Sequence, residues 1–319
     1  MRGPACLLVP LACTSVAWAQ SLESLRQQLR TDLRQAHFAQ TMLGLVLLAD
    51  ELELSGASYE IDNATNTELQ TVSMPFHSRQ SDGDGPRLYY EGTLGFAQAK
   101  ERVDDIYQGT SPGNEAAITT RWRTYGVLGG LGVELPVAAE WTATPIVDVG
   151  VGRIENDTDY AGPGSAAIRA LADGIAFNWD ALAATGGLAG RVDWRHTIDD
   201  ERRLDVIARY DIRWTDTFDA DDSAQEFTAR SQLFTLHGDL TGPTGMLVQE
   251  KPVQWQASAA FRAFPEGDLF GVDHYVQFGG ALLVPTGDRI PYGSGLAFSA
   301  AVMLGEDFFG WTIGGRLMF

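Results

Sequence analysis

The stretch from Arg203 to Trp214 alternates between apolar and charged residues. Its even positions are all apolar: Leu204, Val206, Ala208, Tyr210, Ile212 and Trp214. Most of its odd positions are charged: Arg203, Asp205, Arg209, Asp211 and Arg213. Because successive side chains of a β-strand point to opposite faces, one face of this strand is apolar and the other is ionic. The pattern fits a wall between hydrocarbon and an enclosed interior, and taken alone it also fits an amphipathic strand of a soluble sheet.

Similar alternation continues from about residue 51 to the end of the chain. We place about 12 strands there, each of about 10 to 14 residues, which is the length that a tilted membrane-spanning strand requires. The fold class that we predict is all-β: a closed antiparallel transmembrane β-barrel of about 12 strands with an N-terminal α-helix. Short periplasmic turns are expected at 80–86, 135–139 and 197–201, and external loops at 100–117, 154–176 and 216–225. The connection at 241–252 is long for a periplasmic turn.

The N-terminal part divides into two segments before the barrel. Residues 1–19 have the pattern of a secretory signal peptide, with Arg2, an apolar run and a cleavage site near Ala19. Both cysteines, Cys6 and Cys13, lie in this segment, so we expect no disulfide in the mature chain. Residues 20–42 are predicted to contain a helix, and residues 43–319 to form the barrel.

The predicted helix has a leucine face and a row of three arginines. Leucines recur at spacings of three and four, and Arg26, Arg30 and Arg34 follow at intervals of four. Three positions are open for this helix: free in the periplasm, docked across the barrel mouth, or plugging the lumen.

Charge and residue types exclude several classes of function. A formal net charge of −19 argues against a nucleic-acid partner, which requires a basic footprint. The five histidines include no pair at i, i+4, so a helical zinc site is not expected. The acidic runs Glu155–Asp159 and Asp219–Asp222 do not fit a calcium-binding loop. We therefore predict neither a metal nor a cofactor.

The C-terminal segment has a distinctive pattern of apolar residues. It ends on an aromatic residue and has apolar residues at alternating positions before it: Trp311, Ile313, Leu317 and Phe319. This segment resembles the last strand of bacterial outer-membrane barrels, which the barrel-assembly machinery recognises in those proteins.

A helix before about 12 strands also resembles the translocator domain of autotransporters, whose helix sits in the pore. Few residues precede the first strand here, so no passenger is expected, and secretion of a cargo is in doubt. The chain therefore resembles the solitary autotransporter-like barrels of Gram-negative bacteria. The segments Thr215–Asp219 and Leu240–Gly245 are similar to that group.

Charged residues on the inward faces of the strands form the candidate site. The predicted lumen-facing charges are Glu91, Asp148, Arg191, Asp193, Arg195, Arg203, Asp205, Arg209, Asp211, Arg213, Arg262 and Arg316. One interpretation is a constriction that selects permeants by charge. The other is a structural network of paired charges that fills a narrow lumen. An arginine-rich helix inside the lumen is expected to pair with Asp205, Asp211, Asp148 and Glu91.

The predicted function is structural or passive: an outer-membrane barrel without cargo, or a narrow, helix-plugged, porin-like channel. The expected partners are outer-membrane lipid and lipopolysaccharide, the barrel-assembly machinery and periplasmic chaperones, and the barrel is expected to be a monomer. Two alternatives remain. One is an outer-membrane enzyme, a lipid or peptide hydrolase with its site on the barrel rim. The other is a soluble periplasmic β protein.

Overall fold

The computed structural model describes residues 22–35, 54–61, 67–79, 85–104, 106, 115–265, 272–286 and 295–318. This described part contains two α-helices, α2 (Leu22–Gln35) and α4 (Ser165–Ala172). Its twelve strands are β1 (Leu54–Ile61), β2 (Thr67–Arg79), β3 (Arg87–Val103), β4 (Ala117–Ala138), β5 (Trp141–Ala161), β6 (Trp179–Thr197), β7 (Arg203–Phe218), β8 (Thr228–Val248), β9 (Lys251–Ala263), β10 (His274–Pro285), β11 (Gly295–Gly305) and β12 (Phe308–Met318). The predicted signal peptide and the predicted boundary at residue 43 lie outside the described residues.

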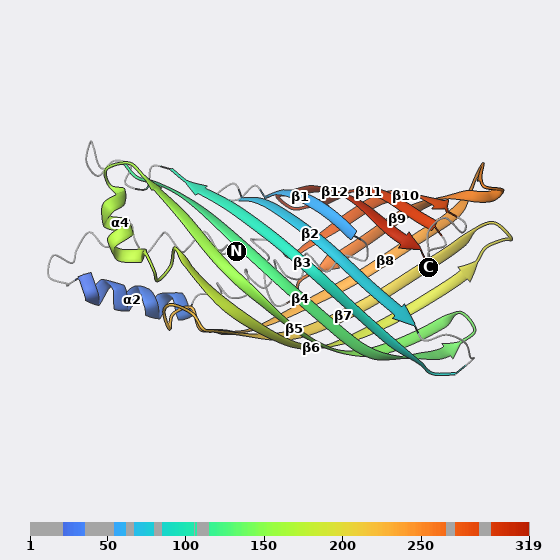
Figure 1. Cartoon of the computed structure of the whole chain (residues 1–319), viewed down its shortest axis with the longest axis horizontal. Helices are drawn as coiled ribbons and strands as arrows, with labels where there is room; N and C mark the ends of the chain where they lie inside the picture. The colour runs from blue at the N-terminus through green and yellow to red at the C-terminus, as the bar shows by residue number, and fades with distance from the viewer. Residues whose placement is uncertain are drawn as a thin grey trace.

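The twelve strands form one closed antiparallel barrel (Figure 1). Each strand pairs with its sequence neighbours, and β1 closes the barrel by pairing with β12, from Leu54 opposite Gly315 to Ile61 opposite Phe308. Along the described strands this closure leaves neither β1 nor β12 as a terminal strand, so the ladder satisfies backbone polar groups without water. The predicted fold class is confirmed.

The outer surface of the barrel is apolar over its middle zone. On β5, Val147, Val149 and Val151 point outward and are 58%, 66% and 58% exposed, whereas the intervening Asp148 is 1% exposed. Outward valines and leucines continue around the other strands. An exposed apolar band of this extent is stable against lipid and not against water. The apolar face of Arg203–Trp214 therefore faces lipid, and the soluble alternative is not favoured.

The polarity of β4 and β5 reverses beyond this band. Outward Arg121 and Arg123 form ion pairs with Asp159 and Asp157 of β5, at 2.7 and 2.6 Å, while Trp122 between the two arginines is buried inside the barrel. A strand that is apolar inside and ionic outside suits water, so this part of the barrel extends beyond the hydrocarbon.

This extension corrects two predictions. Strand lengths range from 8 to 22 residues, beyond the predicted range, because several strands continue into the aqueous zone. The loop predicted from residue 154 begins only after Ala161. Its acidic run is strand because the register places Asp157 and Asp159 opposite Arg123 and Arg121.

The short connections gather at the end of the barrel toward which β12 runs (Figure 1). A two-residue turn, Gln249–Glu250, joins β8 to β9, and both residues have positive φ, 55° and 64°. Positive φ at both central residues defines a type I′ turn, whose twist matches a hairpin. The long connection predicted at 241–252 is therefore wrong, because β8 continues to Val248 with an irregular register between Pro243 and Leu247. Short turns identify this as the periplasmic end.

A cluster of side chains secures another turn at the periplasmic end. Glu140, in the turn between β4 and β5, contacts His196 Nδ1 at 2.9 Å and accepts a hydrogen bond from Trp194 Nε1 at 3.0 Å. Both contacts lower the pKa of Glu140 below its ordinary value, and the contact with His196 has the larger effect. Trp194 also stacks on Trp141, with ring centroids 5.8 Å apart. Indole rings at a strand end are typical of the membrane interface.

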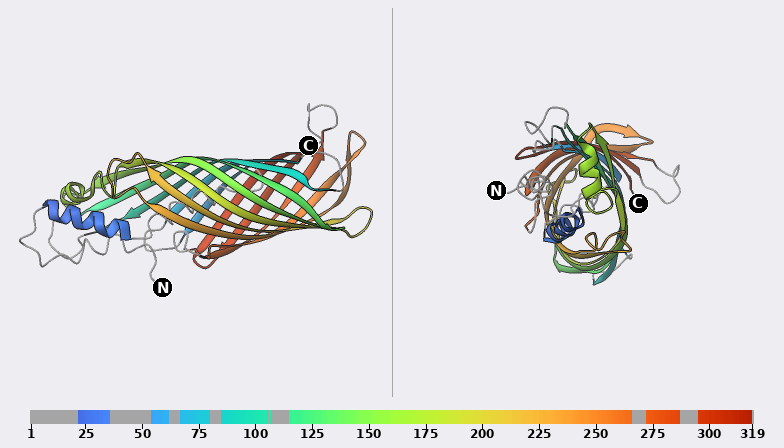
Figure 2. Two further views of the ribbon diagram at one scale, coloured as in Figure 1. Left: turned by 90° about the horizontal axis from the view of Figure 1, so that it is seen from below. Right: turned by 90° about the vertical axis from the view of Figure 1, so that its left-hand side faces the viewer.

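Both helices lie at the opposite, extracellular end (Figures 1 and 2). Helix α4 follows β5, and α2 packs beside it. Neither helix of the described residues is long and apolar enough to span a membrane. Of the three positions considered for the N-terminal helix, the structure places residues 22–35 at the barrel mouth.

We expect Val147→Arg to destabilise the folded barrel by about 2–4 kcal/mol, because its outward side chain is near the centre of the apolar band. Val137→Arg is the matched control. Val137 is equally exposed at 61% but lies beside the periplasmic turn, so a cost of about 0–1 kcal/mol is expected. Urea unfolding in phospholipid vesicles measures both. Equal costs at the two positions would contradict the assigned membrane zone.

Candidate functional site

A salt bridge between β7 and β3 crosses the lumen. Arg209 of β7 donates from Nη1 and Nη2 to the two carboxylate oxygens of Glu91 on β3, both at 2.8 Å. Its Nε also donates to both oxygens of Asp211, at 2.9 and 3.1 Å. Three strands, β4 to β6, separate β3 from β7 around the wall. The contact between Arg209 and Glu91 is therefore a chord through the interior and not a contact along the wall.

A second arginine extends these contacts toward β5. Arg213 donates from Nε to Asp148 at 3.3 Å and from Nη2 to Asp211 at 3.1 Å. The side chains of Arg213, Asp148 and Asp211 are 3%, 0% and 1% exposed. One carboxylate, Asp211, thus links two guanidinium groups, which spreads its charge over both.

A third arginine joins the same set from β6. Arg191 donates to both oxygens of Asp193, at 2.8 and 2.6 Å, and its Nη1 lies 3.3 Å from the Tyr89 hydroxyl. Tyr89 in turn donates to Glu91 at 2.7 Å. We call this connected set the lumen charge network: Tyr89, Glu91, Asp148, Arg191, Asp193, Arg209, Asp211 and Arg213. Tyr89 was missed from the sequence, although it shares a strand face with Glu91.

Glycines on the inner wall leave room for the network. A Cβ at Gly187 of β6 would lie 2.3 Å from Asp148 Oδ1 and 2.7 Å from Arg213 Cγ. A Cβ at Gly130 of β4 would lie 2.9 Å from Glu91 Cγ. Both positions therefore require glycine, because any larger side chain would overlap the charged side chains that pack against the wall there.

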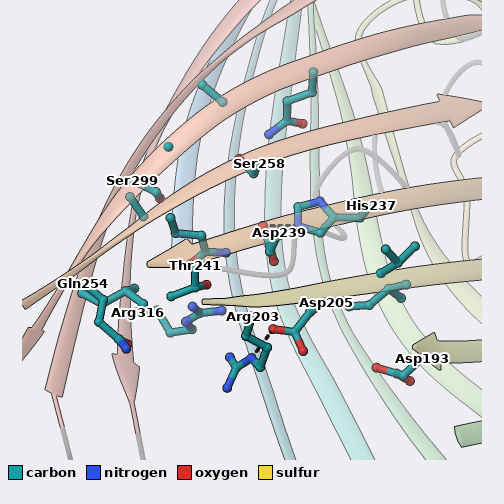
Figure 3. A pocket seen from close by; sticks show the side chains of 18 of the residues that line it. Asp193, Arg203, Asp205, His237, Asp239, Thr241, Gln254, Ser258, Ser299 and Arg316 are labelled. Carbon is teal, nitrogen blue, oxygen red and sulfur yellow. Dashed lines mark hydrogen bonds and ion pairs between the residues drawn. The ribbon is translucent and has the colours of Figure 1, made fainter. Parts of the chain in front are cut away.

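Of the remaining predicted lumen charges, Arg195, Arg203 and Asp205 lie toward the periplasmic end, next to the turn between β6 and β7. Arg203 donates to Asp205 at 2.6 Å, and Arg195 lies 3.9 Å from the same carboxylate. Arg262 is buried, with its Nη1 3.3 Å from the Tyr275 hydroxyl. These four charged residues and Arg316 line one cavity, whose volume is about 560 Å³. In the cavity shown in Figure 3, Nε2 of His237 also lies 2.9 Å from Oδ1 of Asp239.

The inner wall of the extracellular half is apolar, which the sequence analysis did not anticipate. The side chains of Tyr59, Tyr275 and Phe308 point inward. The ring centroid of Phe308 lies 5.4 Å from that of Tyr59 and 5.1 Å from that of Tyr275. Trp122 and Trp179 belong to the same buried cluster. The reversal of polarity along β4 was the signal in the sequence, because Ile118 and Trp122 share one face there.

The helix arginines bind the barrel rim and not the lumen carboxylates. Arg26 donates to backbone oxygens near the end of α4, at 2.8 Å to Ala170 and 3.4 Å to Leu171. Arg30 forms an ion pair with Asp222 at 2.9 Å, and this hydrogen bond raises the pKa of Arg30. The predicted pairing with lumen carboxylates is wrong for these two arginines. The side chain of Arg34 lies outside the described residues.

The predicted assembly signal is described only in part. Trp311 and Ile313 point outward from β12 and are exposed. The side chain of Leu317 and all of Phe319 lie outside the described residues. Across the described ranges, no group of three or more histidine, aspartate or glutamate side chains is arranged to hold a metal ion.

Comparisons with known proteins match the chain to a family of outer-membrane barrels and to similar solved structures. A family model described as "Solitary outer membrane autotransporter beta-barrel domain" matches residues 57–264. The translocator domain of the autotransporter NalP from Neisseria meningitidis is similar in structure, with a TM-score of 0.54 and 11% identity over 91% of this chain and 97% of that one. The β domain of the Bordetella autotransporter BrkA has a TM-score of 0.49 and 13% identity, covering 83% and 96%. No curated protein sequence matches the chain.

We expect Gly187→Ala to lower the free energy of unfolding by about 1–3 kcal/mol, because its methyl group overlaps Asp148 and Arg213. Gly190→Ala on the same strand is the control, since no atom lies within 4 Å of its Cβ position. The control should leave stability unchanged or slightly raised. Urea titration of both variants in vesicles decides, and a Gly187 variant as stable as the control would contradict the packing described.

We expect Arg213→Ala to destabilise the barrel by about 3–5 kcal/mol, because it leaves Asp148 buried without this cation and Asp211 with one guanidinium fewer. Arg121→Ala removes an exposed arginine from the ion pair with Asp159 and should cost less than about 1 kcal/mol. The two variants are compared by heating each to a series of temperatures and measuring the folded fraction from its gel mobility. Similar losses would mean that the network does not hold the wall together.

Proposed function

Because the chain belongs to the solitary outer membrane autotransporter β-barrel domain family, we propose that this outer-membrane barrel is a passive, narrow conduit held closed by its own wall. The salt bridge between Arg209 and Glu91 is the observation that carries this proposal, since it joins strands on different sides of the lumen. The wall itself thus obstructs the lumen, a role that the pore helix has in the autotransporter translocator domains that the chain resembles.

Burial supports a role for the network as a barrier. The side chains of Arg209, Glu91 and Asp211 are 10%, 15% and 1% exposed. Buried ion pairs with well-aligned hydrogen bonds resist separation, because removing one partner leaves an uncompensated charge in a region of low dielectric constant. A permeant would have to break these contacts to pass the side of the lumen that the network occupies.

The contacts of α2 support a secondary role for the helix. Arg26 and Arg30 attach it to α4 and to the connection between β7 and β8, at the extracellular rim. These contacts lie at the rim and not in the middle of the lumen: those of Arg26 are exposed or part-buried, and the side chains of Arg30 and Asp222 are 18% and 14% exposed. We therefore assign the helix to capping the mouth, and the network to closing the lumen.

The proposal makes a specific prediction for ion conductance in planar bilayers. The wild-type barrel should conduct close to the baseline. Glu91→Ala combined with Arg209→Ala should raise the mean conductance about tenfold, because it removes the chord across the lumen and leaves the net charge unchanged. A variant lacking residues 20–35 should stay within about twofold of wild type, since its contacts lie at the rim.

Arg121→Ala combined with Asp159→Ala is the matched control, because it removes an ion pair of the same charge from the outer surface. This control should conduct like wild type. The proposal would be overturned if deletion of residues 20–35 raised the conductance and the Glu91 and Arg209 variant did not. Closure would then belong to the helix. Baseline conductance in every variant would leave a structural barrel and remove the conduit.

A further inference from the structure

We propose that the cavity in the periplasmic half of the lumen binds a small, hydroxyl-rich anion such as a sugar acid. The cavity has a volume of about 560 Å³, within the range that small-molecule sites occupy. It is lined mainly by β6 to β12, and the residues labelled in Figure 3 extend into one shared space. The proposal goes beyond the function inferred above, because binding here does not require that the barrel conduct.

The lining carries an excess of positive charge. It includes five arginines and three aspartates, which leaves a net charge of +2 with His237 neutral. The whole chain has a net charge of −19, so this cationic surface is local to the cavity. Walls of low dielectric constant focus such a potential and attract ions of the opposite sign. The charge of the lining therefore favours an anion.

One carboxylate is shared by two arginines at the cavity. Asp205 accepts a hydrogen bond from Arg203 at 2.6 Å, and Arg195 lies 3.9 Å from its other oxygen. The side chains of Arg203 and Arg195 are 59% and 51% exposed. Each guanidinium has five N–H donors, so donors remain for a ligand carboxylate or phosphate. Bidentate pairing of this kind gives both affinity and orientation.

Neutral polar groups complete the lining on the facing strands. Ser258 of β9, Ser299 of β11 and Gln254 of β9 extend into the cavity with Arg203 and Arg316 (Figure 3). Hydroxyl and amide groups both donate and accept hydrogen bonds. The hydroxyls of a sugar can form hydrogen bonds with such groups, whereas an apolar ligand cannot.

Gln277 of β10 points to the same ligand chemistry. Its Oε1 is buried at the cavity and accepts no hydrogen bond from the described residues. A buried acceptor without a donor costs free energy, which a ligand hydroxyl would recover. Gln277 lies on β10, away from Arg195 and Arg203 on β6 and β7. The lining thus offers two exposed arginines on β6 and β7 and a hydrogen-bond acceptor on β10.

Isothermal titration calorimetry on the folded, full-length barrel in detergent tests this proposal with three probes: D-glucuronate, D-glucose and inorganic phosphate. Glucuronate should bind about tenfold more tightly than either glucose, which lacks the charge, or phosphate, which lacks the sugar hydroxyls. Arg195→Gln combined with Arg203→Gln should weaken glucuronate binding about tenfold or more. Arg121→Gln combined with Arg123→Gln is the control for net charge, since both arginines lie on the outer surface, and it should bind like wild type.

Gln277→Leu separates the sugar from the anion and remains informative if the double arginine variant does not fold. It should weaken glucuronate binding and leave phosphate binding unchanged, because it removes only the proposed acceptor for a hydroxyl. Phosphate binding as tight as that of glucuronate, with no effect of Gln277→Leu, would overturn the assignment to a hydroxyl-rich ligand. The site itself would be overturned if the Arg195/Arg203 and Arg121/Arg123 variants lost glucuronate affinity equally. It would also be overturned if glucuronate gave no larger heat of binding than glucose.

Discussion

The pairing of β1 with β12 is the constraint on which the rest of the structure depends. Hydrocarbon offers no partner for backbone N–H and C=O groups, so the ladder has to close on itself. Closure divides the side chains into two sets with different solvents. Outward positions such as Val147 contact lipid, and inward positions such as Asp148 find partners only across the lumen or along the wall. The ion pairs of Arg209 and Arg213 follow from this division, because a charge enclosed at these positions is costly unless it is paired.

The sequence was sufficient for the class of fold and for the face on which most charges lie. Period-two alternation depends only on backbone geometry, so Arg209 and Asp211 were assigned to one face without knowledge of any neighbour. Their partners were not predictable in this way. Glu91 is separated from Arg209 by 118 positions, and their contact depends on the register of five strands and on the cross-section of the barrel. Tyr89 was missed for the same reason, since its role comes from the arginine and the carboxylate that the fold brings to it.

Alternation also does not state which solvent each face contacts. The acidic run Glu155–Asp159 alternates as regularly as Val147–Val151, yet the structure places its charges outside and its uncharged residues, Asn156 and Thr158, inside. The identity of the outward residues, valine or aspartate, marks the change from lipid to water along a single strand. The helix shows a related limit. A row of arginines indicates a need for anionic or carbonyl partners, and both the lumen carboxylates and the rim oxygens satisfy that need chemically. The structure assigns Arg26 and Arg30 to the rim.

The lumen is asymmetric because the inward side chains differ in size around the wall. Tyr89, Glu91, Arg191 and Arg209 extend from β3, β6 and β7 and meet one another, which fills that side at mid-depth. The facing strands carry small inward residues, among them Ser258, Ala281 and Ala301, and the cavity adjoins them. A rigid barrel cannot collapse onto small side chains as a soluble core does, because its diameter is set by strand number and tilt. The volume left by these residues therefore persists as a polar cavity, and the arginines of β6, β7, β9 and β12 that line it give that cavity its charge.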